Sequence, residues 1–248
     1  MAGLSIQGLS VRLSSRYLLH DVHLRVEAGE AVALVGESGS GKSTLLRACL
    51  GLLPAGMAAG GRIEWCGSNL LEFKPAAWRR VRGREVGWIP QEPSAALDPR
   101  RTAAQLLTEC GGSKAIWAQV GLEAAQQNSY PHEWSGGMQQ RLLVAMALAR
   151  FAATGERLLL ADEPTSALDP LHQARLLELL HRLRQEAGFG LLLVTHDLAV
   201  AAAATSRAYV LHQGSAVEEG ATTELFLNPR HAVTAAMVAA QPRWAVPA

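Results

Sequence analysis

The sequence has few cysteines and no excess of charge of either sign, and each shortage excludes a class of protein. Among its 248 residues are three cysteines, Cys49, Cys66 and Cys110, without a Cys-x-x-Cys pair. Neither a disulfide scaffold nor a zinc knuckle is therefore expected, and scattered thiols of this kind suit a reducing cytoplasm. The 23 basic and 22 acidic side chains leave a net charge of +1. Because this gives no broad basic field, no nucleic-acid partner is expected.

Uninterrupted apolar stretches of membrane-spanning length are also missing. Arg150 breaks the run that follows Leu142, and His196 breaks the run that follows Phe189. No segment is therefore expected to span a bilayer, and any membrane association is expected to go through a partner. Residues 1–12 lack the apolar core of a signal peptide, so none is expected. The chain is nevertheless 49% hydrophobic and 18% charged, a composition that can bury a substantial core.

Strand and helix patterns alternate along the chain. We predict strands at 4–13, 31–35, 62–66, 157–161 and 190–195, helices at 43–53, 137–151 and 170–187, and a loop at 54–61. Strands such as 31–35 are almost wholly apolar, which is typical of a parallel sheet covered on both faces. The expected architecture is one α/β domain over 1–248 with a parallel-sheet core, an inserted helical subdomain at about 93–135 and a C-terminal tail at about 222–248.

A glycine-rich segment follows the apolar strand at 31–35. Its eight residues, Gly36-Glu37-Ser38-Gly39-Ser40-Gly41-Lys42-Ser43, match the phosphate-binding pattern G-x-x-x-x-G-K-[ST] between a strand and a helix. Glycines let successive N–H groups converge on phosphate oxygens at a helix N-terminus. Lys42 is predicted to reach the β- and γ-phosphates and the Ser43 hydroxyl to ligate magnesium. The loop alone fits kinases, GTPases, helicases and transport ATPases alike.

Two carboxylates end the apolar strand that runs from Leu158. Asp162 lies at the predicted strand tip, where a Walker-B carboxylate holds magnesium directly or through water. Glu163 follows it and is placed to polarise an attacking water as a general base. Carboxylates at strand ends are commonly only solvated turn residues, so this interpretation depends on a partner motif.

The partner motif is the segment Trp134-Ser135-Gly136-Gly137-Met138-Gln139-Gln140-Arg141. Its serine and two glycines open a helix, which predicts a second anion-binding N-terminus in a chain that already has one. Two such sites in one small chain imply two chains facing each other. Together with the P-loop and the strand-end carboxylates, this segment resembles the signature of ATP-binding-cassette (ABC) ATPases. Gln91 resembles that family's Q-loop glutamine, residues 166–169 its D-loop, and His196 its switch histidine.

The resemblance implies an ABC ATPase fold of the P-loop NTPase class, with an N-terminal antiparallel β region beside the parallel core, and an ATPase of the translocase type. It assigns ATP and Mg²⁺ as cofactors and Lys42, Glu163 and His196 as catalytic residues. The magnesium residues are expected to be Ser43, Gln91 and Asp162. The ATP-binding residues are expected to be Gly36, Glu37, Ser38, Gly39, Ser40, Gly41, Lys42, Ser43, Thr44, Gln91, Ser135, Gly136 and Gly137. The resemblance also implies that two cassettes pair head to tail. In that pair, Ser135 and Gly137 of one chain cap the γ-phosphate held by the other.

Three further segments resemble the peptide and nickel importer branch: Gln91 to Pro99, Tyr130 to Glu133, and Asn228 to His231. Along its length the chain is most similar to the D-type ATPase of nickel importers. An ATPase subunit does not touch its cargo, so nickel, a metal chelate and short peptides stay open. The branch implies a second, different ATPase chain, two transmembrane permease subunits and an extracytoplasmic solute-binding protein. It also implies a peripheral location on the cytoplasmic face of a bacterial inner membrane.

Three positions, two in the signature and one near the N-terminus, depart from the general family pattern. Trp134 and Met138 replace the usual Leu and Gln around Ser135, and Leu13 stands where an adenine-stacking aromatic is expected, with Tyr17 nearby as a substitute. A soluble ABC ATPase for DNA repair or ribosome work is the alternative class. It is disfavoured because no long coiled coil and no second cassette are present. A small-molecule kinase would not need the signature, and a non-hydrolysing subunit would not need intact catalytic residues.

Overall fold

Two β-sheets form the centre of the computed structural model, which describes residues 3–149, 151, 157–166 and 168–241. The antiparallel sheet has the order β2-β1-β4-β5, with strands β1 Leu4–Leu13, β2 Arg16–Val26, β4 Met57–Trp65 and β5 Ser68–Asn69. The second sheet has the order β10-β9-β3-β8-β7-β6. Its strands are β3 Ala31–Val35, β6 Val86–Ile89, β7 Leu158–Asp162, β8 Gly190–Thr195, β9 Arg207–His212 and β10 Ser215–Ala221.

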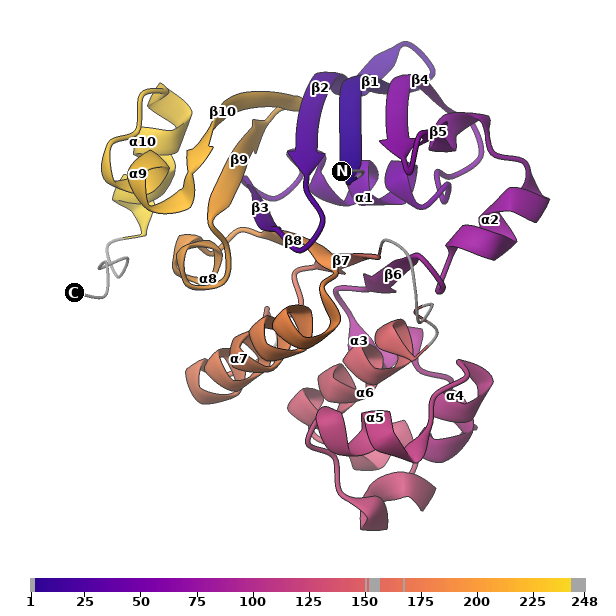
Figure 1. Cartoon of the computed structure of the whole chain (residues 1–248). Helices are drawn as coiled ribbons and strands as arrows, with labels where there is room; N and C mark the ends of the chain where they lie inside the picture. The colour runs from indigo at the N-terminus through magenta and orange to yellow at the C-terminus, as the bar shows by residue number, and fades with distance from the viewer. Residues whose placement is uncertain (1–2, 150, 152–156, 167, 242–248) are drawn as a thin grey trace.

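The helices group around these sheets (Figure 1). Their bounds are α1 Lys42–Cys49, α2 Pro75–Val81, α3 Pro93–Ala96, α4 Ala103–Glu109, α5 Lys114–Gln119, α6 Gly136–Leu148, α7 Pro170–Ala187, α8 Leu198–Ala204, α9 Thr222–Leu227 and α10 Ala232–Ala240, with 3₁₀ turns η1 Leu70–Glu72, η2 Ala124–Asn128 and η3 Pro131–Glu133. Helix α1 lies beneath the antiparallel sheet, α3 to α6 form a lobe below, and α9 and α10 lie beside β10 (Figure 1). Among the described residues, no helix combines the length and the apolar character that a bilayer crossing requires.

The second sheet is parallel except for β10, which runs antiparallel to β9. Every residue of β3, β7 and β8 is buried, and neighbours pair in register, as Ala33 does with Leu193. Burial on both faces explains why these strands are continuous apolar runs. Because parallel strands end at the same edge, the residues that follow β3, β7 and β8 come together there, which is where α/β folds bind ligands.

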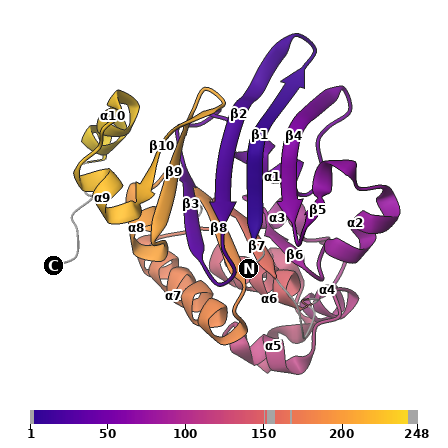
Figure 2. The same cartoon turned by 45° about the horizontal axis from the view of Figure 1, so that its top comes forward.

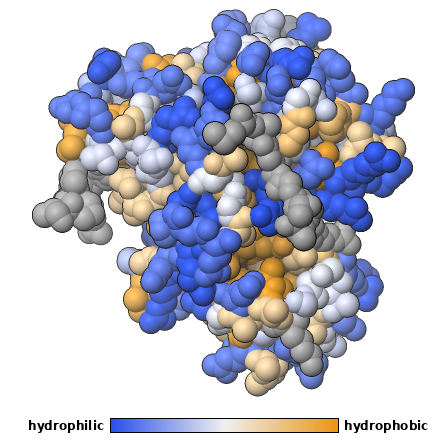
Figure 3. All heavy atoms as spheres, in the orientation of Figure 1, coloured by the Kyte–Doolittle hydropathy of each residue, from blue (hydrophilic) through white to orange (hydrophobic). Residues whose placement is uncertain are grey.

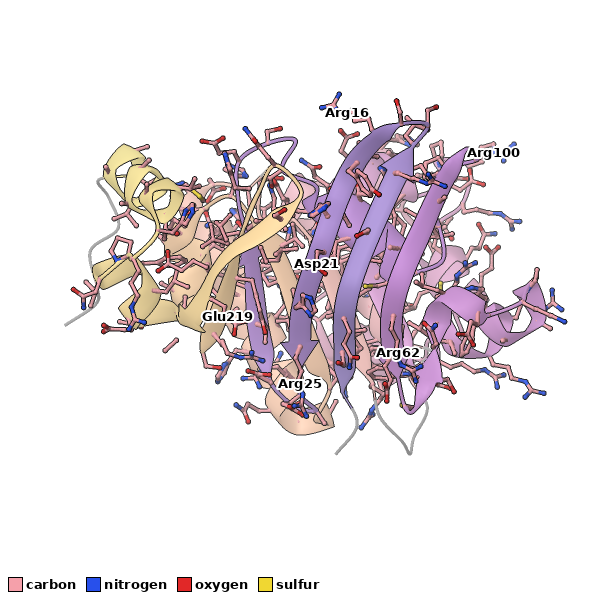
Figure 4. All side chains as sticks on the ribbon, turned by 90° about the horizontal axis from the view of Figure 1, so that it is seen from above. Arg16, Asp21, Arg25, Arg62, Arg100 and Glu219 are labelled. Carbon is pink, nitrogen blue, oxygen red and sulfur yellow. The ribbon has the colours of Figure 1, made fainter. Side chains whose placement is uncertain are left out.

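The antiparallel sheet is buried on one face only. On β2, Val22, Leu24 and Val26 are buried while His23 and Arg25 are exposed, as the two-residue strand period requires. Figure 4 shows this polar side from above, with Asp21 and Arg25 along β2 and Arg62 on β4. The apolar side covers α1 and part of the parallel sheet in one shared core. Figure 2 shows the antiparallel strands crossing in front of the parallel ones.

Two other apolar cores support the helices. One joins α4 to α7 to the parallel sheet and contains Trp117 and Trp134, whose rings meet edge to face with centroids 5.9 Å apart. The other joins α8, α9 and α10 to β3 and β9 and contains Leu198, Phe226 and Met237. These cores hold the signature helix α6 and the C-terminal helices against the same sheet.

The predicted fold class is confirmed, whereas several boundaries were wrong. The helix expected at 43–53 ends at Cys49, because Gly51 turns the chain with a φ of 60°, and the loop expected at 54–61 already contains the start of β4. The helix expected at 137–151 ends at Leu148. Strands β2, β6, β9 and β10 were not predicted. The division into a subdomain at 93–135 and a tail at 222–248 stays a prediction. That tail contains α9 and α10, and its residues 242–248 lie outside the described part.

Candidate nucleotide site

The glycine-rich loop leads directly from β3 into α1, as its sequence predicts. The Lys42 ammonium donates hydrogen bonds to the carbonyl oxygens of Gly36 at 2.7 Å and Glu37 at 2.8 Å. Gly41 has a φ of 110°, and a Cβ there would lie 2.7 Å from the Leu19 side chain. Only glycine therefore lets the loop turn into α1 this close to β2. Lys42 folds back over the loop and gives it a buried positive charge.

Asp162, at the end of β7, lies next to this charge. It is buried, and its Oδ1 has no hydrogen-bond partner among the described residues. Burial raises the pKa of the Asp162 carboxyl, a hydrogen bond with the Ser43 side chain lowers it, and the charge of Glu163 raises it again, with a net increase. Burial lowers the pKa of Lys42, against the opposing charges of Glu163 and Asp162. An unpartnered carboxylate oxygen beside a serine hydroxyl is a donor set that suits a hard divalent cation.

Glu163 and His196 meet across neighbouring strand ends. His196 Nδ1 lies 2.9 Å from Glu163 Oε2, and the Glu163 side chain is 13% exposed against 57% for the histidine. Glu163 has a φ of 44°, which is strained for a side chain of this size. Its N–H donates to the Val194 carbonyl at 2.9 Å, and its carbonyl accepts from the Ser166 hydroxyl at 3.0 Å. These bonds fix the strained backbone and aim the carboxylate at the loop.

A hollow of about 190 Å³ opens over the P-loop. Its lining brings together most of the predicted nucleotide residues: Ser38, Gly39, Gly41, Lys42, Ser43, Thr44, Gln91 and Glu163. A second hollow of about 370 Å³ also borders Ser43, Gln91 and Asp162. Gln91 is exposed and lines both hollows, so it lies between the phosphate loop and the helical lobe that starts at α3.

The signature residues are not part of either hollow. Ser135 is the N-cap of α6, where its hydroxyl accepts a 3.4 Å hydrogen bond from the Met138 N–H. Ser135 and Gly136 are exposed, and Gly137 is half-buried. A Cβ on Gly137 would lie 3.2 Å from the His172 ring, so glycine allows α6 to begin close against α7. Because Ser135 and Gly136 are exposed, the start of α6 lies at the surface, and Figure 1 shows α6 in the helical lobe.

Two further predictions concern the adenine-stacking position and the D-loop. Leu13 and Tyr17 are 43% and 55% exposed and border neither hollow, so a stacking role for Tyr17 stays a prediction. In the D-loop, Ala167 lies outside the described residues, while Asp169 caps α7 through the N–H groups of Leu171 and His172 at 3.1 Å.

Two residues at the site were not predicted. Arg47 and the exposed Trp88 line the second hollow. The sequence signal for Arg47 was its helical spacing from Ser43, which places both on one face of α1. Trp88 had no such signal, because its strand β6 was itself missed.

Comparisons with known proteins agree with this geometry. A family model described as ABC transporter matches residues 19–166. The oligopeptide transport ATP-binding protein OppF of Escherichia coli is 40% identical over 235 residues, which cover 89% of this chain and 68% of that protein. The dipeptide transport ATP-binding protein DppD of Lactococcus lactis is 35% identical over 90% of this chain and 68% of its own length.

Solved structures show the same architecture. The dimeric structure of MJ0796, a bacterial ABC transporter cassette, superposes with a TM-score of 0.75 at 26% identity, over 88% of this chain and 98% of that one. A post-hydrolysis dimer of the same cassette bound to ADP and phosphate superposes with a TM-score of 0.73 at 26% identity, over the same shares of the two chains. The phosphate loop, strand-end carboxylates and exposed start of the signature helix thus lie on a known scaffold, and the chain belongs to the ABC transporter family as an ATP-binding, ATP-hydrolysing cassette.

Proposed function

We propose that this chain is the ATPase subunit of an importer of short peptides. The relatives described above are named for oligopeptide and dipeptide transport, which favours peptides over the nickel or metal-chelate cargo that the D-type resemblance also allows. Identity of 40% across 89% of the chain is the observation that carries the cargo class. A soluble ABC ATPase for DNA repair or ribosome work is the alternative, and no contact in the described residues favours it.

ATP binds, in this proposal, over the P-loop of the first hollow. The loop's N–H groups and Lys42 hold the phosphates, because a buried ammonium and converging amides stabilise anions strongly in a site that excludes water. Mg²⁺ fits beside them, held by Ser43, Asp162 and the Gln91 side chain. When bound, it neutralises phosphate charge. The unpartnered Oδ1 of Asp162 supports this assignment.

Hydrolysis depends on Glu163 and His196. Glu163 accepts a proton from the attacking water as a general base, for which its place in the lining of the hollow over the P-loop suits it. His196, in contact with Glu163, orients that carboxylate and reaches the γ-phosphate side through its exposed ring. Gln91, which borders both hollows, responds to the γ-phosphate and links it to the helical lobe.

A second cassette completes each site. The exposed N-terminus of α6 is a ready anion site that the hollow in its own chain does not include, and it supports a head-to-tail pair in which Ser135, Gly136 and Gly137 cap nucleotide held by the partner. The similar bacterial cassette MJ0796, whose structure is dimeric, supports such a pair. By the branch resemblance we propose a heterodimer with a different ATPase chain.

The helical lobe is the proposed contact with the membrane partners. Figure 3 shows an apolar area on this lobe, and the second hollow is lined by the exposed Trp88 and, at the start of the lobe, by the exposed Ala95 and Ala96. Exposed apolar surface of this kind marks interaction sites. We propose two permease subunits, an extracytoplasmic solute-binding protein and a peripheral location on the cytoplasmic face of the bacterial inner membrane.

Uptake in a deletion strain tests the cargo. We expect loss of uptake of a labelled dipeptide or tripeptide, restored by the wild-type gene but not by Glu163→Gln, with labelled nickel uptake unchanged. Loss of nickel uptake with unchanged peptide uptake would show that the cargo is a metal and not a peptide. Unchanged uptake of both, with ATPase activity intact in the purified chain, would favour the soluble class.

A further inference from the structure

The side chain of Gln241 forms two hydrogen bonds with the backbone of the loop that carries His196; we call this pair of bonds the bracket. Gln241 follows the last turn of α10, 45 residues along the chain from His196. Its Nε2 donates a 2.8 Å hydrogen bond to the His196 carbonyl, and its Oε1 accepts a 3.0 Å bond from the Leu198 N–H. One amide group therefore holds the peptide before and the peptide after Asp197, across the turn between β8 and α8.

Only a primary amide makes this pair of contacts. It needs a donor for a carbonyl and an acceptor for an N–H on one planar group. The loop's other bonds lie elsewhere: the Asp197 carboxylate caps α8 through the Ala199 N–H at 2.8 Å, and the Asp197 N–H donates to the Thr195 hydroxyl at 3.0 Å. Within the described residues, the side-chain hydrogen bond to the His196 backbone comes from Gln241.

Helix α10, which Gln241 follows, is itself held in place by contacts with β10 and α8. At its start, Glu218 of β10 accepts the N–H groups of Arg230 and His231 at 2.8 and 3.1 Å. In its middle, Met237 is buried in the same core as Leu198 of α8. The helix is thus fixed just before its first residue and at its centre, and Gln241 ties its end to the loop.

We propose that Gln241 is a positioning residue for ATP hydrolysis, which keeps the His196 ring against Glu163 by fixing the loop backbone. The proposal rests on the role of His196 given under Proposed function. The exposed ring contacts Glu163, and its direction depends on the backbone that carries it. Without the bracket, the loop samples other conformations and the contact at 2.9 Å is kept for a smaller fraction of the time.

The test compares Gln241→Ala and Gln241→Glu in the full chain, assembled with its transporter partners. Gln241→Glu is nearly isosteric but replaces the donor with a second acceptor opposite a carbonyl. Asn228→Ala is the matched control, because Asn228 also ends a C-terminal helix and its amide bonds only Glu224, at 3.0 Å. We expect kcat to fall about tenfold in both Gln241 variants, the loss of roughly one positioning hydrogen bond, with KM for ATP within about twofold and the control unchanged.

Two readouts separate positioning from a merely structural effect. Amide exchange of the loop peptide around 194–200 should speed up in Gln241→Ala and not in Asn228→Ala. In a His196→Ala background, Gln241→Ala should cause no further fall in kcat, because coupled residues are non-additive. Equal falls in both backgrounds, or an unchanged kcat despite faster exchange, would overturn the proposal while leaving the function intact. If His196→Ala itself keeps full kcat, the assigned role of His196 fails first.

Discussion

The strained backbone of Glu163 determines where its carboxylate lies in the site. Glu163 adopts a left-handed backbone that places its carboxylate beside Lys42 rather than along the strand of Asp162. Residues in such conformations persist when surrounding bonds over-determine them, and here Val194 and Ser166 supply those bonds. The two adjacent carboxylates thus lie in different surroundings, with Asp162 buried beside Ser43 and Glu163 next to His196.

Replacing Glu163 with Gln tests its role as general base. The amide keeps the shape but cannot accept a proton, so we expect kcat to fall about 100-fold or more, with affinity for a fluorescent ATP analogue within about twofold. Glu186→Gln, an exposed change of the same kind on α7, is the control. Retained turnover in Glu163→Gln would assign the base elsewhere.

The site residues that could be predicted are those fixed by local sequence. Lys42 and Ser43 lie in a contiguous motif, and Asp162 and Glu163 follow an apolar run whose parallel neighbours end at the same edge. Gln241 could not be found in this way. Its contact with His196 spans 45 residues and depends on how α9 and α10 pack, which no local pattern records.

At the scale of elements, a charged pair joins the turn before β3 to β9. Arg207 donates to Glu30 at 2.9 and 3.1 Å and to the Tyr209 hydroxyl at 2.7 Å. Burial opposes ionisation of Glu30, but hydrogen bonds from Arg207 and from the Glu27 N–H outweigh it, so the pKa of Glu30 is lowered from 4.5. The pair pins the start of β3, and with it the strand that leads into the P-loop.

The lowered pKa of Glu30 gives the pair a predicted pH dependence. A depressed carboxyl pKa contributes stability that is present above the unfolded value and lost as pH falls through the folded one. Glu30→Gln should therefore lower the free energy of unfolding by about 2 kcal/mol at pH 7. The difference from wild type should shrink as the pH falls below 4.5, as urea melts at pH 7 and pH 3.5 would show. A difference that grows on acidification would contradict this account.

Trp134 anchors the signature helix to the helical lobe. It is buried, and its ring packs on Trp117. Trp134→Ala should therefore cost about 3–5 kcal/mol of stability, through lost burial and a cavity, measured by denaturant unfolding. Trp134→Leu, which restores the general family residue, should cost less. Equal stability of wild type and Trp134→Ala would show that the ring does not hold the lobe.

Helices and strands could be predicted where a segment showed one clear pattern of apolar residues. The buried strands β3 and β8 and the helix α7, which Asp169 caps, match their predicted bounds. Strand β2 was missed because Asp21 takes a positive φ at a register shift between β1 and β2, which interrupts the alternation of apolar residues along β2. The start of β4 was missed because its first six residues are exposed or half-buried. These strands exist through pairing with β1, a non-local contact.

At the scale of the whole molecule, one chain carries two half-sites that do not meet. The hollow over the P-loop gathers the residues proposed to bind phosphate and to catalyse hydrolysis, while the exposed α6 N-terminus is the second proposed anion site, on the helical lobe. Under the proposed function, nucleotide is held between two chains, so hydrolysis depends on their association.

The Ser135→Asp variant tests this arrangement most directly. Asp keeps the capping ability of Ser135 at α6 but puts a carboxylate where the partner's γ-phosphate is expected. The measurement is ATP hydrolysis by the assembled transporter beside ATP affinity of the isolated chain. Our account predicts hydrolysis lowered about tenfold or more with the affinity unchanged, because the chain's own hollow is intact. Undiminished hydrolysis, or an equal loss of ATP affinity in the isolated chain, would contradict the shared site.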